Sequence, residues 1–410
     1  MPLIPSQSDI CIIGAGPAGA TASMFLSQMG IPHLLIDKDV FPRDKICGDG
    51  IDPNSIRVLN QFNPQLVADL LANTDQYQAI KGVRFTAPNG VRSEAMYRKT
   101  KDAAPEPMYI TGKRLHFDHF LHQQLDPRTA NIQLGATVTD IQRKENGVEL
   151  TIEKDGATHT VFTRLLLGAD GDHSIVQRKL DERKIDRRHY AAALRMYCAG
   201  VSDMHPENLI EVYFPKSVPL GYFWIFPLPN GEMNVGFGLA SHEISRHKIN
   251  LQKAFEQILT TDPFIAPRFA AARRLEMPRG WGLPLASRQR KNVGDNFLLV
   301  GDSGSLIQPL SGEGIGSAMI AGWTAAQFAR KAVETQRFDA ASMANYQRES
   351  VRRMDDEVRA YNFIMRTRPM LWQSHFLNVL IGGGIAKPLF ERAARQWMLT
   401  ATTKPLEVKF

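Results

Sequence analysis

The chain has 410 residues, of which 43% are hydrophobic and 22% are charged, with 31 Gly and 24 Pro. This length predicts two to three domains or one large interleaved α/β enzyme, and this composition excludes a disordered, collagen-like or linker-like chain. The net charge of +7 permits an anionic membrane surface, a phosphorylated ligand or nucleic acid as partner, and equally well represents ordinary solubility charge.

The N-terminus lacks the basic region of a secretory signal, and its first apolar run, Ile10 to Ile13, leads directly into a glycine motif. An apolar stretch around 376–385 is too short and too rich in glycine for a membrane-spanning helix. Three cysteines, Cys11, Cys47 and Cys198, are too few for a disulfide framework or a four-cysteine zinc site, and no HExxH or CxxC motif is present. We therefore expect a cytoplasmic protein without a metal site.

The first 38 residues predict a βαβ unit. Asp9 to Ile13 is a short apolar strand, Gly14 to Gly19 a turn, Ala18 to Met29 a helix of small residues, and His33 to Lys38 a second strand. Such a unit is the usual setting of a dinucleotide site.

The turn has the sequence Gly14-Ala15-Gly16-Pro17-Ala18-Gly19, which matches GxGxxG. Gly14 permits the tight turn, Gly16 lets the backbone approach a pyrophosphate, and Gly19 allows close packing of helix on strand. The helix N-terminus supplies amide donors, and Asp37, at the end of the second strand, is placed to bind an adenosine ribose. The motif therefore predicts a dinucleotide site, and the carboxylate disfavours a 2′-phosphate.

The middle of the chain is rich in predicted strands. Residues 78–97 and 147–167 alternate in polarity around the hairpin signals Asn89-Gly90 and Asp155-Gly156. Further strands are predicted at 191–200, 209–214 and 221–239, the last interrupted by the turn Pro229-Asn230-Gly231. A late strand, Asn296 to Val300, leads through a glycine-rich loop into a helix expected over 313–333, and residues after about 341 are helical and rich in Arg.

Two later motifs place an aspartate beside a glycine turn at a strand end: Gly168-Ala169-Asp170-Gly171 and Gly301-Asp302. With the N-terminal GxGxxG, this ordered set resembles flavoproteins of the aromatic-hydroxylase superfamily. The resemblance implies FAD, with Asp302 at the ribitol or pyrophosphate and Asp170 holding the fold around the pyrophosphate. The loop Pro309 to Ile315 precedes a long helix whose first amides need a partner, and the resemblance implies that they face flavin N1 and C2=O.

Three segments resemble the geranylgeranyl reductase family within that superfamily. Phe41 to Gly50, FPRDKICGDG, resembles its PRxKxCGxG segment, and Tyr222 to Pro227, YFWIFP, fits its YxWxFP signature. Residues 301–315 resemble its late FAD loop, although Ser303 and Ser305 replace the more usual Ala and Gly. The resemblance implies saturation of isolated C=C bonds in prenyl chains with reduced FAD.

Such a reaction needs a hydride on one carbon and a proton on the other, and Cys47 and Tyr222 are the protic candidates in the family segments. Tyr222, Trp224 and Phe226 alternate along a strand, so they share one face and line either an apolar tunnel or an ordinary core. Cys11 and Cys198 lie in apolar strands and are expected to be inert core residues.

Arg114, in the segment GKRLHFD, resembles the Arg of the family's RxxFD segment near the cofactor; the alternative is a surface arginine at a helix start. The expected FAD-binding residues, carried by the motifs and by the resemblance, are Gly14, Gly16, Pro17, Ala18, Gly19, Asp37, Lys38, Arg43, Cys47, Gly48, Arg114, Val138, Asp170, Gly171, Gly301, Asp302, Gly312, Gly314 and Ile315.

The predicted fold is α/β: a discontinuous Rossmann-like FAD-binding domain interleaved with a mixed or antiparallel β-sheet substrate domain, followed by a C-terminal helical region. We expect the FAD-binding domain over 1–75, 111–185 and 285–340. The β-sheet domain is expected over 76–110 and 186–284, and the helical region over 341–410.

The implied partners are a hydrophobic isoprenoid substrate and a membrane surface, with a seven-base stretch between Arg268 and Lys291 as a candidate for anionic headgroups or a diphosphate. A nucleic-acid-binding module is not recognisable. Only one dinucleotide fingerprint is present, so the electron donor is NAD(P)H bound without its own domain or a ferredoxin-like protein. The sequence leaves the oligomeric state open.

Two alternatives remain at this stage. One is a flavin-dependent monooxygenase or halogenase on the same fold, although halogenases share a WxWxIP motif that residues 223–227 lack. The other is a non-catalytic flavin-binding protein docked on a membrane, which turnover with a reductant would exclude.

Overall fold

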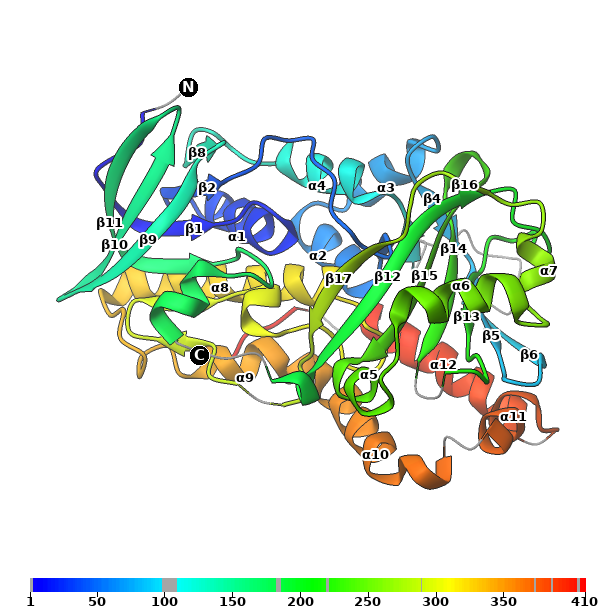
Figure 1. The fold of residues 1–410 in the computed structure, drawn as a ribbon. Coiled ribbons are helices and arrows are strands. Elements are labelled where there is room, and N and C mark those ends of the chain that lie inside the picture. The colour runs from blue at the N-terminus through cyan, green and yellow to red at the C-terminus, as the bar shows by residue number, and fades with distance from the viewer. Residues whose placement is uncertain are drawn as a thin grey trace.

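The structure is a computed structural model that describes residues 3–97, 109–181, 186–218, 221–288, 290–371, 374–384, 386–403 and 406–410. Two large sheets lie at opposite ends of the molecule, joined by loops and by helices that run between them (Figure 1). The helices of the described part include none whose length and apolar character suffice to cross a membrane.

The first sheet is built around parallel strands. In order they are β18 (Val293–Gly294), β19 (Phe297–Leu299), β11 (Ala157–Gly168), β1 (Gln7–Ile13), β2 (His33–Asp37) and β8 (Ala130–Leu134). The long strand β11 extends past β1 to form an antiparallel meander with β10 (Gly147–Lys154) and β9 (Thr137–Lys144). The predicted hairpin turn Asp155-Gly156 is confirmed, because both residues have positive φ, at 51° and 78°.

Both faces of the parallel strands are buried, which explains their nearly continuous apolar runs. Ile10 and Ile12 face the helices α1 (Pro17–Gln28) and α8 (Ile315–Thr335), whereas Cys11 and Ile13 face the β9–β10 meander. Helices α1 and α8 pack closely, since a Cβ on Gly322 would lie 2.2 Å from a backbone oxygen of Ala18. The helices predicted over 18–29 and 313–333 are thus present with boundaries displaced by one or two residues.

The second sheet is formed by the middle of the chain. Helices cover one of its faces, and the other, called the hollow face below, lines a cavity. Its strand order is β16 (Arg273–Arg274), β12 (Tyr190–Ala199), β15 (Glu232–Ala240), β14 (Tyr222–Pro227), β13 (Ile210–Tyr213), β5 (Gly82–Thr86) and β6 (Arg92–Met96), and β17 (Arg279–Pro284) also pairs with β12. Phe223 and Phe237 pack under α5 (Ser241–His247), α6 (Leu251–Thr261) and α7 (Ala266–Phe269), in a core that includes Cys198. The prediction that Cys11 and Cys198 are core residues is confirmed.

The predicted strand region 78–97 is divided between two sheets. β4 (Gln78–Ile80) joins a small sheet with β3 (Gly50–Ile51) and β7 (Tyr109–Thr111), whereas β5 and β6 form the predicted hairpin around Asn89-Gly90. The remaining helices before the C-terminal region are α2 (Pro53–Phe62), α3 (Gln65–Ala72) and α4 (Arg114–His122). Part of the expected range 76–110, residues 98–108, lies outside the described residues.

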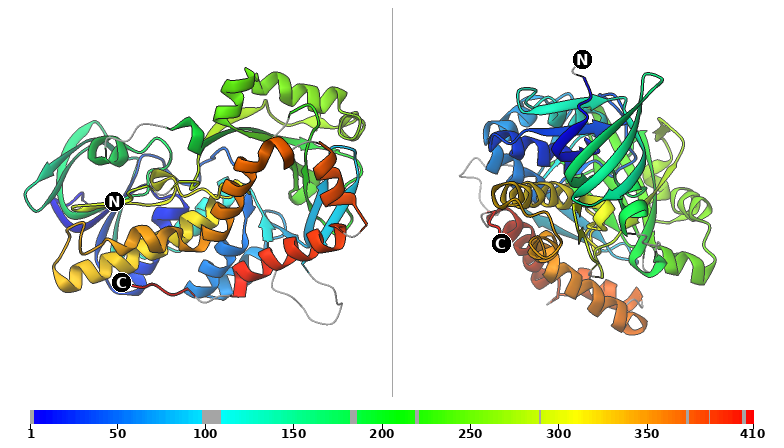
Figure 2. Two further views of the ribbon diagram at one scale, coloured as in Figure 1. Left: turned by 90° about the horizontal axis from the view of Figure 1, so that it is seen from below. Right: turned by 90° about the vertical axis from the view of Figure 1, so that its left-hand side faces the viewer.

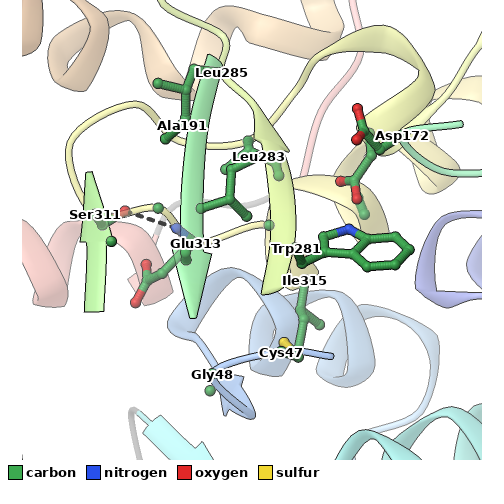
Figure 3. Close-up of a pocket in the computed structure, with 18 of the residues that line it drawn as sticks. Cys47, Gly48, Asp172, Ala191, Trp281, Leu283, Leu285, Ser311, Glu313 and Ile315 are labelled. Atoms are coloured by element: carbon green, nitrogen blue, oxygen red, sulfur yellow. Dashed lines mark hydrogen bonds between the residues drawn. The ribbon is translucent and has the colours of Figure 1, made fainter. Parts of the chain in front are cut away.

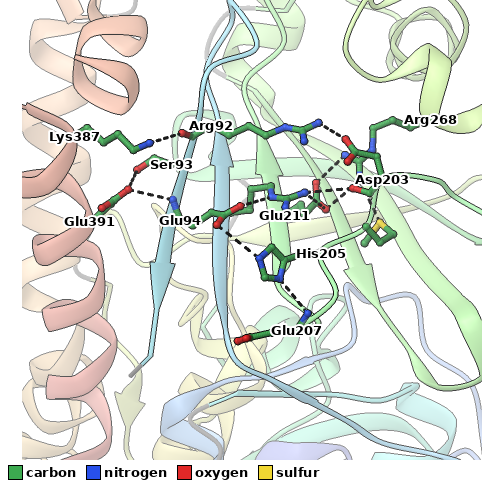
Figure 4. A network of polar contacts seen from close by, with 12 residues as sticks. Arg92, Ser93, Glu94, Asp203, His205, Glu207, Glu211, Arg268, Lys387 and Glu391 are labelled. Atoms are coloured by element: carbon green, nitrogen blue, oxygen red, sulfur yellow. Dashed lines mark hydrogen bonds and ion pairs between the residues drawn. The ribbon is translucent and has the colours of Figure 1, made fainter. Parts of the chain in front are cut away.

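The C-terminal region is helical, as predicted. It comprises α9 (Asn345–Val351), α10 (Asp355–Leu371), α11 (Ser374–Gly382) and α12 (Ala386–Thr403). These helices run from α8 along one side of the molecule and reach the edge of the second sheet (Figure 2). Helix α12 is fixed to β6 there, because Glu391 accepts hydrogen bonds from Ser93 Oγ at 2.9 Å and Glu94 N at 3.3 Å, and Lys387 donates to the Arg92 carbonyl (Figure 4).

Candidate functional site

A cavity of about 1090 Å³ lies between the two sheets. One end is formed by the loops after β1, β2, β11 and β19, and its wall continues along the hollow face of the second sheet to α10, α11 and α12. Loops at the carboxyl ends of parallel strands are the usual ligand site of α/β sheets. The predicted site residues converge here: all except Gly19 and Gly301 line the cavity.

The GxGxxG turn forms one rim of the cavity. Gly14 has φ of +99°, and a Cβ there would lie 2.3 Å from the Ala169 carbonyl, so glycine is required on both grounds. A Cβ on Gly16, by contrast, would have only the Arg43 guanidinium within 4 Å, at 3.5 Å, which leaves this position open to a ligand. Gly19 does not face the cavity, because a Cβ on it would lie 1.8 Å from the Gly14 carbonyl; it serves the close packing that the motif predicts.

Asp37 ends β2 and lines the cavity, but part of its carboxylate is already used. It accepts hydrogen bonds from Ala15 N at 2.5 Å and from Asp39 N at 2.8 Å, which hold the glycine turn against the second strand. Burial raises the pKa of this carboxyl, while the two backbone donors act in the opposite direction. Lys38, Val138 and Gly171 lie on the same part of the wall.

The two later aspartates have different surroundings. Asp170 Oδ2 accepts a hydrogen bond from Ile175 N at 2.7 Å, and its Oδ1 is buried without a partner among the described residues. Asp302 lies on the cavity wall, where burial raises the pKa of its carboxyl and the charge of Lys45 lowers it. Gly301 forms the turn before it with φ of +70° and packs against Ala18 and Ala318.

The two departures from the family's late loop fit the backbone. Ser303 is fully buried, and its hydroxyl contacts the carbonyls of Gly168 and Val300. Ser305 has φ of +57°, a conformation in which glycine is the easier residue, so this serine carries a modest strain.

The loop 41–50 forms the opposite rim and is fixed by buried ion pairs. Arg43 donates to Asp118 at 2.8 Å, and Arg114 contacts both oxygens of the same carboxylate at 2.6 and 2.7 Å. The alternative that Arg114 is a surface residue is wrong, because it is only 5% exposed; its charge also acts on the Cys47 thiol. Burial raises the pKa of the Cys47 thiol, so Cys47 holds its proton at neutral pH.

Asp49 connects this loop to the second sheet, a role that the sequence did not predict. Its side chain accepts hydrogen bonds from Tyr197 Oη at 2.7 Å, Asn234 Nδ2 at 2.8 Å and Arg114 N at 3.2 Å. Burial raises the pKa of Asp49 to about 6 against these donors. Asn234 also donates to the Cys47 carbonyl at 2.8 Å and accepts from Trp224 Nε1 at 2.9 Å, so the cysteine loop is tied to β14 and β15.

The aromatic strand β14 faces the cavity with alternate residues. Tyr222, Trp224 and Phe226 all line it, with successive ring centroids 5.9 and 6.4 Å apart, whereas Phe223 and Ile225 belong to the core behind the sheet. The prediction that the three aromatics share one face is confirmed. A Cβ on Gly236, the cross-strand partner of Trp224, would lie 2.0 Å from the indole, so this glycine makes room for the ring.

Strand β14 also spans the distance between the two rims. A Cβ on Gly48 would lie 3.8 Å from Trp224 and from Phe226, and a Cβ on Gly312 would lie 2.8 Å from Tyr222 Oη. The hydroxyl of Tyr222 donates to the Ser311 carbonyl at 2.5 Å. The cysteine loop and the late loop therefore meet the same strand at different residues.

The late loop leads into α8 and is contacted by carboxyl groups of other elements that the motifs did not indicate. Glu357 of α10 accepts hydrogen bonds from Leu310 N at 2.8 Å and Ser311 N at 2.9 Å, which fixes the loop. Asp52 caps α2, and its carboxyl lies against Gly316 in the first turn of α8, where a Cβ would be 1.9 Å from Oδ1. Gly312, Gly314 and Ile315 lie on the cavity wall. Cys47, Asp172, Trp281 and Ile315 surround the same space (Figure 3).

The wall becomes apolar beyond β14. Val83 and Phe85 of β5 and Ile210 and Val212 of β13 continue the sheet face, and Leu377, Leu380, Ile381 and Phe390 of α11 and α12 close it from the other side. Phe85 and Phe390 meet edge to face with centroids 5.0 Å apart. At about 4.8 Å per strand, the three steps from β15 to β5 cover about 14 Å.

The basic stretch 268–291 is not a uniform exposed surface. Arg268 is buried and contacts both oxygens of Glu211 at 2.7 and 3.0 Å, so the expectation that it meets headgroups or a diphosphate is wrong. Arg274 pairs with Glu256, Arg279 with Asp44 and Arg288 with Asp186. The acidic partners lie elsewhere in the sequence, which is why the stretch alone suggested an excess of charge.

The residues around the first part of the cavity fit FAD. The open cradle at Gly16, the free space above Gly171 and the unpartnered Asp170 Oδ1 are suited to a pyrophosphate and its attached sugars. In the described part of the chain, no group of three or more His, Cys, Asp or Glu side chains is arranged to hold a metal ion.

Comparisons with known proteins agree with this geometry. The FAD binding domain family matches residues 7–349. Digeranylgeranylglycerophospholipid reductase 1 of Methanothermobacter thermautotrophicus is 29% identical over 366 residues, which cover 88% of this chain and 86% of that protein. Menaquinone reductase of Mycobacterium tuberculosis is 30% identical over 341 residues, covering 79% and 77%.

Solved structures show the same fold. A geranylgeranyl bacteriochlorophyll reductase-like protein from Thermoplasma acidophilum superposes with a TM-score of 0.75 at 19% identity, over 98% of this chain and 94% of that one. The flavin-dependent brominase Bmp2 gives 0.70 at 20% identity, over 96% and 100%, so the fold alone does not separate reductases from halogenases. Together with the family match and the curated relatives, the cysteine loop and the aromatic strand show that the chain belongs to the geranylgeranyl reductase family of FAD-dependent oxidoreductases.

Proposed function

We propose that the protein saturates C=C bonds of an isoprenoid chain carried by a lipid, a diphosphate or a quinone. The observation that carries the proposal is the continuity of the cavity: the residues that fit FAD pass without interruption into an apolar groove along β14, β13 and β5. A chain lying across these strands would place one of its double bonds beside β14, between the Cys47 loop and the 312–315 loop. The relatives named for reduction of archaeal lipids and menaquinone support this substrate class.

The roles of the residues follow from their positions. Gly14, Gly16, Asp37, Asp170 and Asp302 would hold the nucleotide and pyrophosphate, and Arg43, Cys47, Gly48, Arg114 and the 312–315 loop would enclose the flavin ring. When bound and reduced, FAD supplies a hydride. Tyr222, Trp224 and Phe226 would orient the alkene and exclude water, which favours reduction over side reactions with solvent.

Cys47 remains the protic candidate at the cysteine loop, because burial raises the pKa of its thiol and the residue lines the cavity. Tyr222 is less free, since its hydroxyl already donates to the Ser311 carbonyl. Electrons would come from NAD(P)H or a ferredoxin-like protein that reaches the flavin from outside.

A membrane surface is the proposed source of the substrate, so the protein would act in the cytoplasm as a peripheral membrane protein. The helices that close the apolar end of the cavity also expose large apolar side chains, among them Phe363 of α10 at 61% and Leu389 of α12 at 64%. We place the membrane contact on α10–α12 and not on the ion-paired 268–291 stretch.

Anaerobic single turnover tests the function. Reduced protein is mixed with a prenyl lipid, flavin reoxidation is followed by absorbance, and products are examined by mass spectrometry. Gains in steps of two hydrogens are expected. Gain of oxygen or halogen in aerobic assays with an aromatic substrate would support the monooxygenase or halogenase alternative, and absence of any turnover with a reductant would support the non-catalytic one.

A further inference from the structure

Glu313 lies within the late loop 301–315 and on the cavity wall, but neither the family resemblance nor the proposed flavin contacts assign a role to its carboxyl group. It lies between Gly312 and Gly314 on the loop that precedes α8, and its amide is fixed by Ser311 Oγ at 3.3 Å. In Figure 3 its carboxyl points away from Cys47 and Trp281. It therefore faces a different part of the cavity from the cysteine loop.

Three tyrosines from three different elements share the cavity wall with this carboxyl and feel its charge. Tyr109 belongs to β7 and interacts with it most directly, Tyr97 follows β6, and Tyr222 belongs to β14. All three line the same cavity as Glu313. They form a small polar region at the point where the aromatic strand gives way to the apolar groove.

The charges that face Glu313 in the described part of the chain are those of two other carboxyl groups, Asp52 at the start of α2 and Glu357 of α10. Glu357 accepts hydrogen bonds from Leu310 N and Ser311 N, and Asp52 accepts them from Ser55, which partly offsets the burial that raises the pKa of both carboxyls. Burial and these two like charges raise the pKa of Glu313 well above its ordinary value. Burial raises the pKa of Asp52 and Glu357 as well, but both have backbone donors that act in the opposite direction, so Glu313 is the strongest candidate of the three to hold a proton.

A second observation also indicates a polar function at this position. The hydroxyl of Tyr97 is buried on the cavity wall, with 6% of the residue exposed, and has no hydrogen-bond partner among the described residues. Buried hydroxyls are normally paired, so one that faces a cavity indicates a group that pairs with ligand or water. Tyr97, Tyr109 and Glu313 are thus protic groups on the wall of an otherwise apolar groove.

We propose that Glu313 is a catalytic acid that delivers a proton to the alkene, with Tyr109 and Tyr97 as positioning residues. The inference rests on the proposed isoprenoid reduction. The reduced flavin provides the hydride for one alkene carbon and is oxidised by two electrons. The O–H bond of Glu313 breaks, a C–H bond forms at the other carbon, and the carboxylate regains its proton from water through the tyrosine hydroxyls.

The test is Glu313→Gln, which keeps the size and the neutral state of the side chain and removes the acidic proton. FAD content and binding of a twenty-carbon prenyl diphosphate, used as the probe, are expected to remain unchanged. The single-turnover rate should fall by about 100- to 10,000-fold, the usual effect of losing a general acid. The wild-type rate should decline as pH rises through the Glu313 pKa, and the residual rate of the variant should lack this decline.

Infrared difference spectroscopy gives a readout that does not depend on turnover. The carbonyl stretch of a protonated carboxylic acid is expected in the resting wild type at neutral pH and should be missing from Glu313→Gln. Tyr109→Phe keeps the acid and removes the neighbouring hydroxyl, so it should move the pH profile without abolishing the reaction. The matched control is Glu334→Gln on the same loop-to-helix segment, whose carboxyl is 62% exposed at the far end of α8 and should leave all readouts unchanged.

The outcomes separate the two proposals. A wild type that reduces the probe and a Glu313→Gln variant with the same rate and pH profile overturn only the acid role, and a large loss in Cys47→Ala would then assign it to Cys47. A wild type that reduces no prenyl probe, even with the infrared band present, overturns the proposed function and the acid role with it.

Discussion

At the scale of single residues, a substitution of Gly16 is expected to affect cofactor binding without affecting folding. Its φ is −67° and its ψ is −174°, a conformation open to any residue, and a Cβ would meet only the Arg43 guanidinium. We therefore predict that Gly16→Val folds but no longer retains FAD, because the side chain occupies the space of the pyrophosphate. Flavin absorbance of the purified protein measures retention, and circular dichroism verifies folding. Gly384→Val, at a position with no neighbour within 4 Å, is the control; full flavin in folded Gly16→Val would remove Gly16 from the site.

Two substitutions of Asp302 are expected to weaken FAD binding to different extents. Its side chain faces the cavity near Lys45 and not the core, so Asp302→Ala should weaken FAD binding more than it disturbs the fold. A hydrogen bond to a charged acceptor contributes about 1.5 to 3 kcal/mol, which corresponds to roughly ten- to a hundredfold in affinity. Flavin titration of the apoprotein gives this value. Asp302→Asn, which keeps an acceptor, should lose less, and an unchanged Kd in both variants would contradict the assignment.

At the scale of elements, β14 is the wall that positions the substrate. Trp224 fills the space left by Gly236 and donates to Asn234, which in turn holds the Cys47 loop. Trp224→Ala should therefore retain FAD but change which double bonds are reduced, because both the wall and the loop become less constrained. Product analysis by mass spectrometry checks this. Trp224→Phe keeps an aromatic side chain but loses the hydrogen bond to Asn234. If only Trp224→Ala changes which double bonds are reduced, the effect comes from the lost aromatic wall and not from the lost hydrogen bond.

Helix α12 depends on polar anchors at its junction with β6. Glu391→Ala removes the acceptor for Ser93 Oγ and Glu94 N, and Phe390 beside it should then pack less firmly on Phe85. We expect a local loss of about 1 kcal/mol, or roughly fivefold faster amide exchange in α12. Hydrogen exchange with mass spectrometry measures it. Arg392→Ala, at an exposed neighbouring position, should exchange as the wild type does; equal protection in Glu391→Ala would show that the apolar contacts suffice.

At the scale of the whole molecule, the cavity lies between two sheets that ion pairs join across it. Asp44 of the FAD side pairs with Arg195 and Arg279 of the second sheet, at 3.5 and 3.0 Å. Because FAD would fill this space and bind only the folded protein, its removal should lower the thermal midpoint. Free FAD at about 100 times its Kd should add about 2.7 kcal/mol. Thermal unfolding of the apoprotein with added FAD measures this, and FMN, which lacks the adenosine, should stabilise less; equal effects would contradict a nucleotide site at Gly14–Gly19.

The sequence alone determined the turns, the hairpin and the strand faces, because these features depend on residues close together in the chain. The glycine turn between β1 and α1, the Asp155-Gly156 hairpin and the shared face of Tyr222, Trp224 and Phe226 all follow from backbone preference or strand periodicity, which act over a few residues. The cofactor and family also followed from ordered motifs. Helix ends were displaced by one or two residues, because caps such as Gly16 and Gly314 are decided by local geometry.

Only the tertiary structure decided which charges are buried and which meet. Arg268 pairs with Glu211, and Arg114 pairs with Asp118 near Cys47. The charges along the sequence do not predict these pairs, because the partners are brought together by tertiary packing. Asp49 and Glu313 lay within recognised motifs, but their partners, Tyr197, Asn234, Tyr109 and Glu357, come from distant strands and helices. The free energy that fixes these groups comes from desolvation and hydrogen bonds across the fold, so their protonation and chemistry are properties of the assembled structure and not of any segment.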